Sequence, residues 1–72
     1  MTNMMKLKGV MVEKGMTQEK LAELIGMDRS TLIRKMKNEG LQFTVEDVQN
    51  ITKALNLKPE EVLAIFFTEN VA

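Results

Sequence analysis

The side chains best suited to binding chemistry gather in one short stretch, residues 29–38. The stretch contains four cations and three smaller hydrogen-bonding side chains: Arg29, Ser30, Thr31, Arg34, Lys35, Lys37 and Asn38. Side chains of these types can bind phosphate groups and the acceptor atoms on the edges of bases. The alternative is a solvated helix face, on which Asp28 or Glu39 would be the ion-pair partners of the cations.

Catalytic chemistry has little support in this sequence. The chain contains no His and no Cys, so the usual general base, thiol nucleophile and transition-metal ligands are missing. Ser30 is the only serine and has no base partner. The four glycines are scattered singly, and the ten carboxylates do not have the spacing of a calcium-binding loop. We therefore expect no enzymatic activity, no metal site and no cofactor.

The net charge is zero, but the charged side chains are unevenly distributed. Residues 1–37 contain eight basic and four acidic side chains, a net charge of +4. Residues 38–72 contain two basic and six acidic side chains, a net charge of −4. This division predicts a basic face and an acidic face, and the basic half is the one that contains the binding stretch.

Length and composition indicate one small soluble domain over residues 1–72. A chain of this length fits a single domain, and an apolar content of 44% is enough for a helical core. The lack of Cys is consistent with a reducing compartment. The longest apolar run, Val62–Phe67, is far too short to span a bilayer, and the N-terminus has no apolar segment of signal-peptide length. We expect a cytoplasmic protein without a membrane partner.

Two short helices joined at a glycine position the binding stretch. Residues 17–39 read TQEKLAELIGMDRSTLIRKMKNE. Thr17 and Asp28 are suitable N-caps for the two helices, because their side-chain oxygens can accept hydrogen bonds from the free amides of an opening turn. Gly26 stands where the end of the first helix favours a left-handed residue. Helices joined by so short a turn cross steeply, which predicts a helix-turn-helix over residues 17–38.

Apolar residues at helical spacing predict which faces of these two helices are buried. They are Leu21, Ala22, Leu24 and Ile25 in the first helix, and Leu32 and Met36 in the second. Ala22 is small, as a close crossing of two helices requires. Because successive residues turn by about 100°, the face opposite Leu32 and Met36 carries Ser30 and Arg34, with Lys37 at its edge.

Three further helices are expected around this pair, which makes the fold class all-α, a compact bundle of about five short helices. The first has an apolar face of Met5, Leu7, Val10 and Met11, which Met4 could extend, and it ends near Lys14, with Gly15 closing it. The fourth begins at Thr44, with Asp47 completing a capping box, and buries Val45, Val48, Ile51 and Leu55. The fifth begins at Pro59 and continues to Phe67. Leu41 and Phe43 are expected to anchor the connector before the fourth helix.

The motif T-Q-x-x-L-A-x-x-x-G-x-x-x-S-T-L, which begins at Thr17, resembles the helix-turn-helix of the Cro/repressor (lambda-repressor-like, XRE) family of DNA-binding proteins. The motif covers about a third of the chain. The resemblance implies sequence-specific binding to double-stranded DNA by a small transcriptional regulator, a repressor of phage, prophage or mobile-element type. No small-molecule ligand is evident.

The second helix of such a motif enters the major groove with its N-terminal part. Arg29, Ser30, Thr31 and Arg34 are the expected base contacts, and each arginine can donate two hydrogen bonds to a guanine edge. Thr17, Gln18, Lys35, Lys37 and Asn38 are the expected phosphate contacts; for Gln18 this role is implied by the family resemblance. Ile33 has two possible roles, contact with a thymine methyl group or packing on the fourth helix.

The last helix is apolar on nearly all sides, which predicts an interface. We expect a two-fold homodimer through Val62, Ile65, Phe66 and Phe67, over a helix spanning residues 59–67, with two recognition helices roughly 34 Å apart. The alternative is that the phenylalanines cover the domain's own core. A different function also stays open, a protein-interaction module of antirepressor or antitoxin type on a helix-turn-helix scaffold, because a fold does not determine function.

Overall fold

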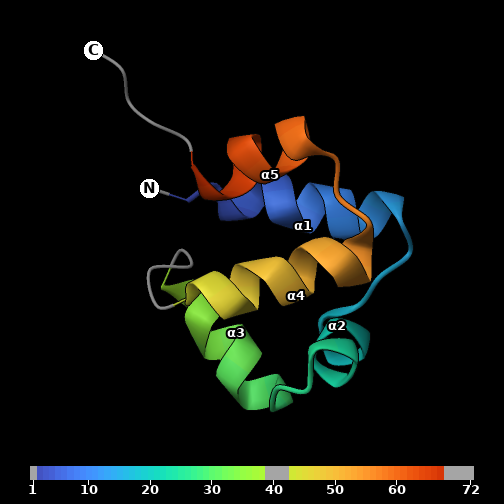
Figure 1. Cartoon of the computed structure of the whole chain (residues 1–72). Helices are drawn as coiled ribbons and strands as arrows, with labels where there is room; N and C mark the ends of the chain where they lie inside the picture. The colour runs from blue at the N-terminus through green and yellow to red at the C-terminus, as the bar shows by residue number, and fades with distance from the viewer. Residues whose placement is uncertain (1, 39–42, 68–72) are drawn as a thin grey trace.

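A computed structural model describes residues 2–38 and 43–67 of the chain, and this part is all-helical (Figure 1). Five α-helices form within it: α1 (Met4–Glu13), α2 (Gln18–Ile25), α3 (Arg29–Lys37), α4 (Val45–Leu55) and α5 (Pro59–Phe66). The predicted fold class, an all-α bundle that contains a helix-turn-helix, is confirmed.

Three of the helices end with the same backbone conformation. Gly15, Gly26 and Asn56 have left-handed φ values of 66°, 70° and 53°. In each case the N–H of the next residue donates to a carbonyl five positions earlier, as from Met27 to Ala22 at 2.9 Å. This is the Schellman arrangement, which reverses the chain and directs an apolar side chain back towards the helix. Each of the three junctions therefore needs only a left-handed residue, an apolar residue and the cap of the next helix.

Side-chain caps begin three of the helices. The Asn3 Oδ1 and Thr17 Oγ1 atoms accept hydrogen bonds from the backbone N–H groups of Lys6 and Lys20, both at 3.0 Å. Thr44 and Asp47 form the predicted capping box at the start of α4. Free amides at a helix start are costly unless they are satisfied, so these caps define where the helices begin.

One hydrophobic core joins the five helices. The largest fully buried side chains come from every helix: Leu7, Leu21, Leu32, Ile51, Leu55 and Ile65. Helix α2 packs against both α3 and α4, and α1 packs against α5. Helix α4 lies between the α1–α5 pair and the α2–α3 pair (Figure 1). Ala22 is only 2% exposed and is therefore part of the core, as predicted.

Three apolar residues that were expected to be buried are exposed instead. Met5, Leu24 and Val45 have 85%, 52% and 76% of their surface accessible. Leu24 and Val45 lie roughly 100° around their helices from the centre of the buried side, and Met5 lies roughly 150° from it, so the predicted stripes were too wide. The expected connector anchor Leu41 and the ion-pair candidate Glu39 lie outside the described residues.

We predict that Gly26→Ala destabilises the domain by about 1 kcal/mol, because a Cβ is disfavoured in the left-handed region. No side chain would clash with that Cβ, since nothing lies within 4 Å of its position. The backbone alone should therefore set the cost. Urea unfolding followed by far-UV circular dichroism measures this difference.

Gly9→Ala is the matched control. Gly9 lies inside α1 without a left-handed φ, and the site of its Cβ is equally open. This change should stabilise the domain by about 0.5–1 kcal/mol, because alanine favours a helix interior. Equal effects of the two changes would contradict the assignment of Gly26 as a conformational requirement.

Candidate nucleic-acid interface

One face of α3 is exposed to solvent and carries hydrogen-bond donors. Leu32 and Met36 are buried, at 0% and 3% exposure, and they hold the helix on the core. The exposed side chains on the remaining surface are Arg29, Ser30, Arg34, Lys37 and Asn38. Thr31 is partly buried on the flank. The structure thus brings together, on one short helix, the four residues expected to contact bases.

The cations of this face are not neutralised by neighbours in the part of the chain that the structure describes. Two ion pairs form among residues 2–38 and 43–67, Lys20 with Glu23 at 3.6 Å and Lys35 with Asp47 at 2.8 Å. Arg29, Arg34 and Lys37 belong to neither pair. Exposed cations with flexible stems can reach an anionic partner with little desolvation.

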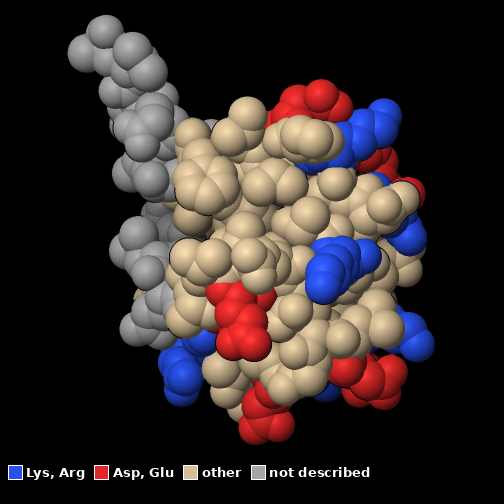
Figure 2. All heavy atoms as spheres, in the orientation of Figure 1, with Lys and Arg blue, Asp and Glu red and all other residues tan. Residues whose placement is uncertain are grey.

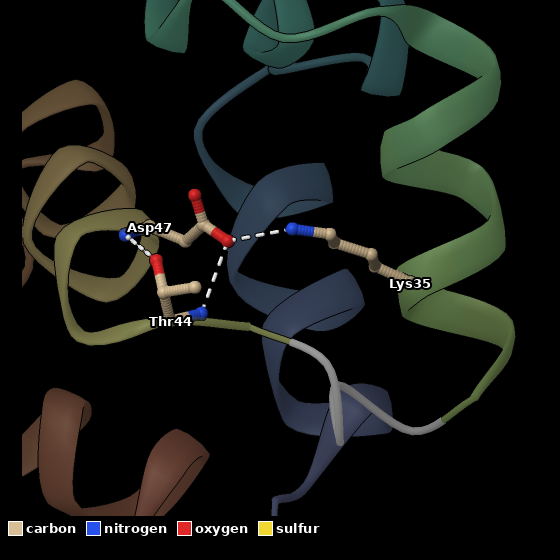
Figure 3. A network of polar contacts seen from close by, with 3 residues as sticks. All are labelled: Lys35, Thr44 and Asp47. Atoms are coloured by element: carbon tan, nitrogen blue, oxygen red, sulfur yellow. Dashed lines mark hydrogen bonds and ion pairs between the residues drawn. The ribbon is translucent and has the colours of Figure 1, made fainter.

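Lys35 differs from the other cations of α3 because its charge is used within the protein (Figure 3). Its Nζ donates to Asp47 Oδ2 on α4, and the two side chains are only 16% and 15% exposed. The same carboxylate oxygen accepts from the Thr44 N–H at 3.0 Å, and Thr44 Oγ1 accepts from the Asp47 N–H at 3.0 Å. Lys35 therefore already has an anionic partner within the protein.

The environment of Asp47 lowers its pKa. Burial alone would raise the pKa of this carboxyl, but the hydrogen bonds from Lys35 and the Thr44 backbone, together with the Lys35 charge, outweigh burial. The pKa therefore lies below its ordinary value of 3.8. Asp47 is ionised at neutral pH, and its negative charge is directed towards α3.

The start of α2 supplies a second polar group of the predicted interface. Thr17 Oγ1 is occupied as the acceptor for the Lys20 amide, but its hydroxyl proton can still donate to another group. Gln18 follows as the first residue of α2 and is partly buried.

Asp28 stands at the predicted cap position of α3, yet its side chain makes no capping hydrogen bond. Its carboxylate remains exposed beside Arg29.

Helix α5 divides the residues that were predicted to form a dimer interface. Ile65 and Phe66 are 0% and 5% exposed and belong to the core, so they are not on the surface open to a second copy. Val62 is partly buried, whereas Phe67 is 56% exposed. Beside them lies an apolar groove of about 780 Å³ between α4 and α5. Figure 2 shows that this face is mostly uncharged over α5 and the adjoining part of α4.

Within residues 2–38 and 43–67, no helix has the length and apolar character needed to cross a bilayer. No cluster of three or more Asp or Glu side chains that could hold a metal ion occurs in that part of the chain either.

The fold and the exposed face of α3 define a helix-turn-helix protein. A family model described as a Cro/C1-type helix-turn-helix DNA-binding domain matches residues 6–67 of the chain. The protein therefore belongs to the Cro/C1-type helix-turn-helix family and is a small regulator that binds double-stranded DNA. No curated protein and no solved structure gives a significant match.

The sequence did not reveal the partner of Lys35. Asp47 was identified from its capping position alone, and Lys35 was assigned to the phosphate-binding set from its place in a basic run. The two residues are 12 positions apart and belong to different helices. Hydrophobic periodicity predicts the buried face of one helix at a time, so a contact between side chains of two helices has no sequence signal of its own.

We predict that Asp47→Asn lowers the free energy of unfolding by about 1 kcal/mol at neutral pH, because the ion pair with Lys35 is lost. The folded-state pKa of Asp47 is depressed, so its contribution is complete above the unfolded-state pKa and is lost as pH falls through the folded-state value. The difference between wild type and variant should therefore shrink as the pH falls below 3.8, the ordinary value of this carboxyl. Urea unfolding across this pH range measures it.

Glu46→Gln provides the control, since Glu46 is exposed in the same first turn of α4. Its effect should be smaller at every pH, because only the interaction with the helix dipole is removed. A wild-type advantage over Asp47→Asn that stays constant from neutral to acidic pH would show that the carboxylate charge is not the cause.

Proposed function

We propose that this protein reads a specific sequence in the major groove of double-stranded DNA and acts as a transcriptional repressor of phage, prophage or mobile-element type. The observation that supports it best is the exposed face of α3, where Arg29 and Arg34 are free of ion pairs within the described residues. Helix-turn-helix proteins read bases with this part of the second helix. The protein would act in the cytoplasm of a bacterial or phage-infected cell.

The polar side chains fall into two roles in this proposal. Arg29 and Arg34 donate paired hydrogen bonds to guanine edges, and Ser30 and Thr31 contact neighbouring bases. Thr17, Gln18, Lys37 and Asn38 bind phosphates on either side of the groove. Phosphate contacts set the register of the protein on the duplex without reading sequence, so the two groups should respond differently to substitution.

The active form proposed here is a homodimer. Phe67, which follows α5 and lines the apolar groove between α4 and α5, is 56% exposed, and Leu63 on α5 is 60% exposed. A two-fold interface of this kind would bury that surface and repeat the recognition helix at a spacing of roughly 34 Å. The operator would then be a palindrome.

Selection from a random duplex library tests base recognition. We expect wild-type protein to enrich a palindromic site and Arg34→Ala to lose about 1–3 kcal/mol of binding free energy, with relaxed preference at one guanine position of each half-site. Lys8→Ala is the control, because Lys8 is an exposed cation on α1 rather than on α3. It should retain the wild-type site preference.

The absence of an enriched sequence would reject sequence-specific binding. If the double variant Arg29→Ala, Arg34→Ala also kept the protein's activity in the cell, that activity would not depend on DNA reading. The protein-interaction module would then be the better assignment. Binding that weakens steeply between about 50 and 200 mM salt, without any sequence preference, would leave only a non-specific DNA-binding role.

Analytical ultracentrifugation tests the dimer. We expect Phe67→Ser to weaken self-association by about tenfold or more, because a large apolar side chain would leave the interface. Leu24→Ser is the control, since Leu24 is a comparably exposed apolar residue, at 52%, on α2. A wild-type monomer at high micromolar concentration would contradict the dimer.

A further inference from the structure

We propose that Lys35 is a positioning residue and not a phosphate contact: its ion pair with Asp47 holds the recognition helix α3 at the capped start of α4. The proposal rests on the DNA-binding function proposed above, because it assigns a role to α3 in recognition. In this proposal Asp47, an acidic residue outside the proposed DNA contacts, supports DNA binding indirectly by holding Lys35.

Lys35 lies at the edge of the proposed DNA-binding face, on the flank of α3 that also carries Thr31. It follows Arg34 by about 100° around the helix, on the side away from Ser30 and Lys37. Its side chain extends from α3 towards α4, as Figure 3 shows. At 16% exposure the side chain is enclosed by the protein, whereas Arg34 and Lys37 are exposed.

Two kinds of contact hold the ammonium group at this place. The first is the 2.8 Å hydrogen bond to Asp47 Oδ2. The second is the aromatic ring of Phe43, whose centroid lies 6.0 Å from Nζ. Phe43 in turn packs edge-on against Phe66 of α5, with 6.2 Å between the ring centroids. Cations are attracted to aromatic faces at this range. The end of α3 is therefore connected to α4 and, through Phe43, to α5.

The acceptor is itself rigidly placed, which is what a positioning contact requires. Asp47 Oδ2 also accepts from the Thr44 backbone N–H, and the Asp47 N–H donates to Thr44 Oγ1. The capping box thus holds both the carboxylate and the backbone N–H of Asp47. Both α3 and α4 pack against α2, and the ion pair adds a direct polar connection between them. Small displacements of a recognition helix misalign its hydrogen bonds with base edges, so such a restraint favours binding.

The sign of the Asp47→Asn effect on DNA affinity distinguishes positioning from simple charge. Removal of a negative charge should strengthen binding to a polyanion if charge alone acts. We expect the opposite, a specific affinity about three- to tenfold weaker, because α3 loses its restraint. Lys35→Met should cause a similar loss, and the double variant should lose little more than either single variant, because both changes remove the same contact. Fluorescence anisotropy on the selected duplex measures all three.

The salt dependence separates Lys35 from a true phosphate contact. Lys37→Met is the matched control on the same helix, and it should reduce the slope of log K against log salt by about 0.9. Lys35→Met should leave the slope unchanged while it lowers affinity. Lys35→Arg keeps a cation that can bond Asp47 and should restore most of the affinity. A reduced slope for Lys35→Met, or tighter binding by Asp47→Asn, would overturn the proposal.

Unfolding measurements test the Lys35–Asp47 ion pair independently of DNA binding. Circular dichroism establishes that each variant is folded, and a double-variant cycle on urea midpoints detects coupling between the two residues. Coupling together with the expected affinity losses supports the positioning role. If the two residues are coupled but the wild-type protein binds no specific duplex, the proposed function is rejected. The ion pair is then only a structural contact. The lack of any coupling would reject the restraint itself, whatever the DNA result.

Discussion

The burial of Leu32 and Met36 is the interaction on which the proposed interface depends. Helix α3 has nine residues, too few to be stable alone in water, and these two are its buried side chains. Their position on one side of α3 leaves the opposite side free for Ser30 and Arg34, while Arg29 is exposed in the first turn. Because only these two side chains of α3 are buried in the core, its polar side stays exposed.

The orientation of α3 follows from its junction with α2. Gly26 adopts a left-handed conformation, and the Met27 N–H returns to the Ala22 carbonyl, which turns the chain within a few residues. Met27 packs against the core, so the reversal is held by burial as well as by hydrogen bonds. The same arrangement recurs after Gly15 and Asn56. Such junctions allow short helices to surround a small core without long loops.

Basic residues serve two purposes in this neutral chain. Lys14 donates to the Leu55 and Asn56 carbonyls at 2.7 and 3.4 Å, where its charge compensates the end of α4. Lys35 is bound to Asp47. Both cations thus have partners within the protein. The net charge of +4 over residues 1–37 therefore overstates what is available to a phosphate backbone. The exposed cations of α3 form a smaller, more local basic surface.

The sequence by itself determined the class of fold, the helix-turn-helix and the exposed face of α3. These features are local: a capping threonine, a glycine at a helix end and apolar residues three or four positions apart each act within one or two turns of chain. The tertiary structure alone decided that Lys35 faces Asp47, that Phe66 enters the core while Phe67 does not, and that Met5, Leu24 and Val45 remain exposed. Each of those outcomes depends on the angle at which one helix meets another. That angle is set by the simultaneous packing of five helices, and no single segment of the chain encodes it.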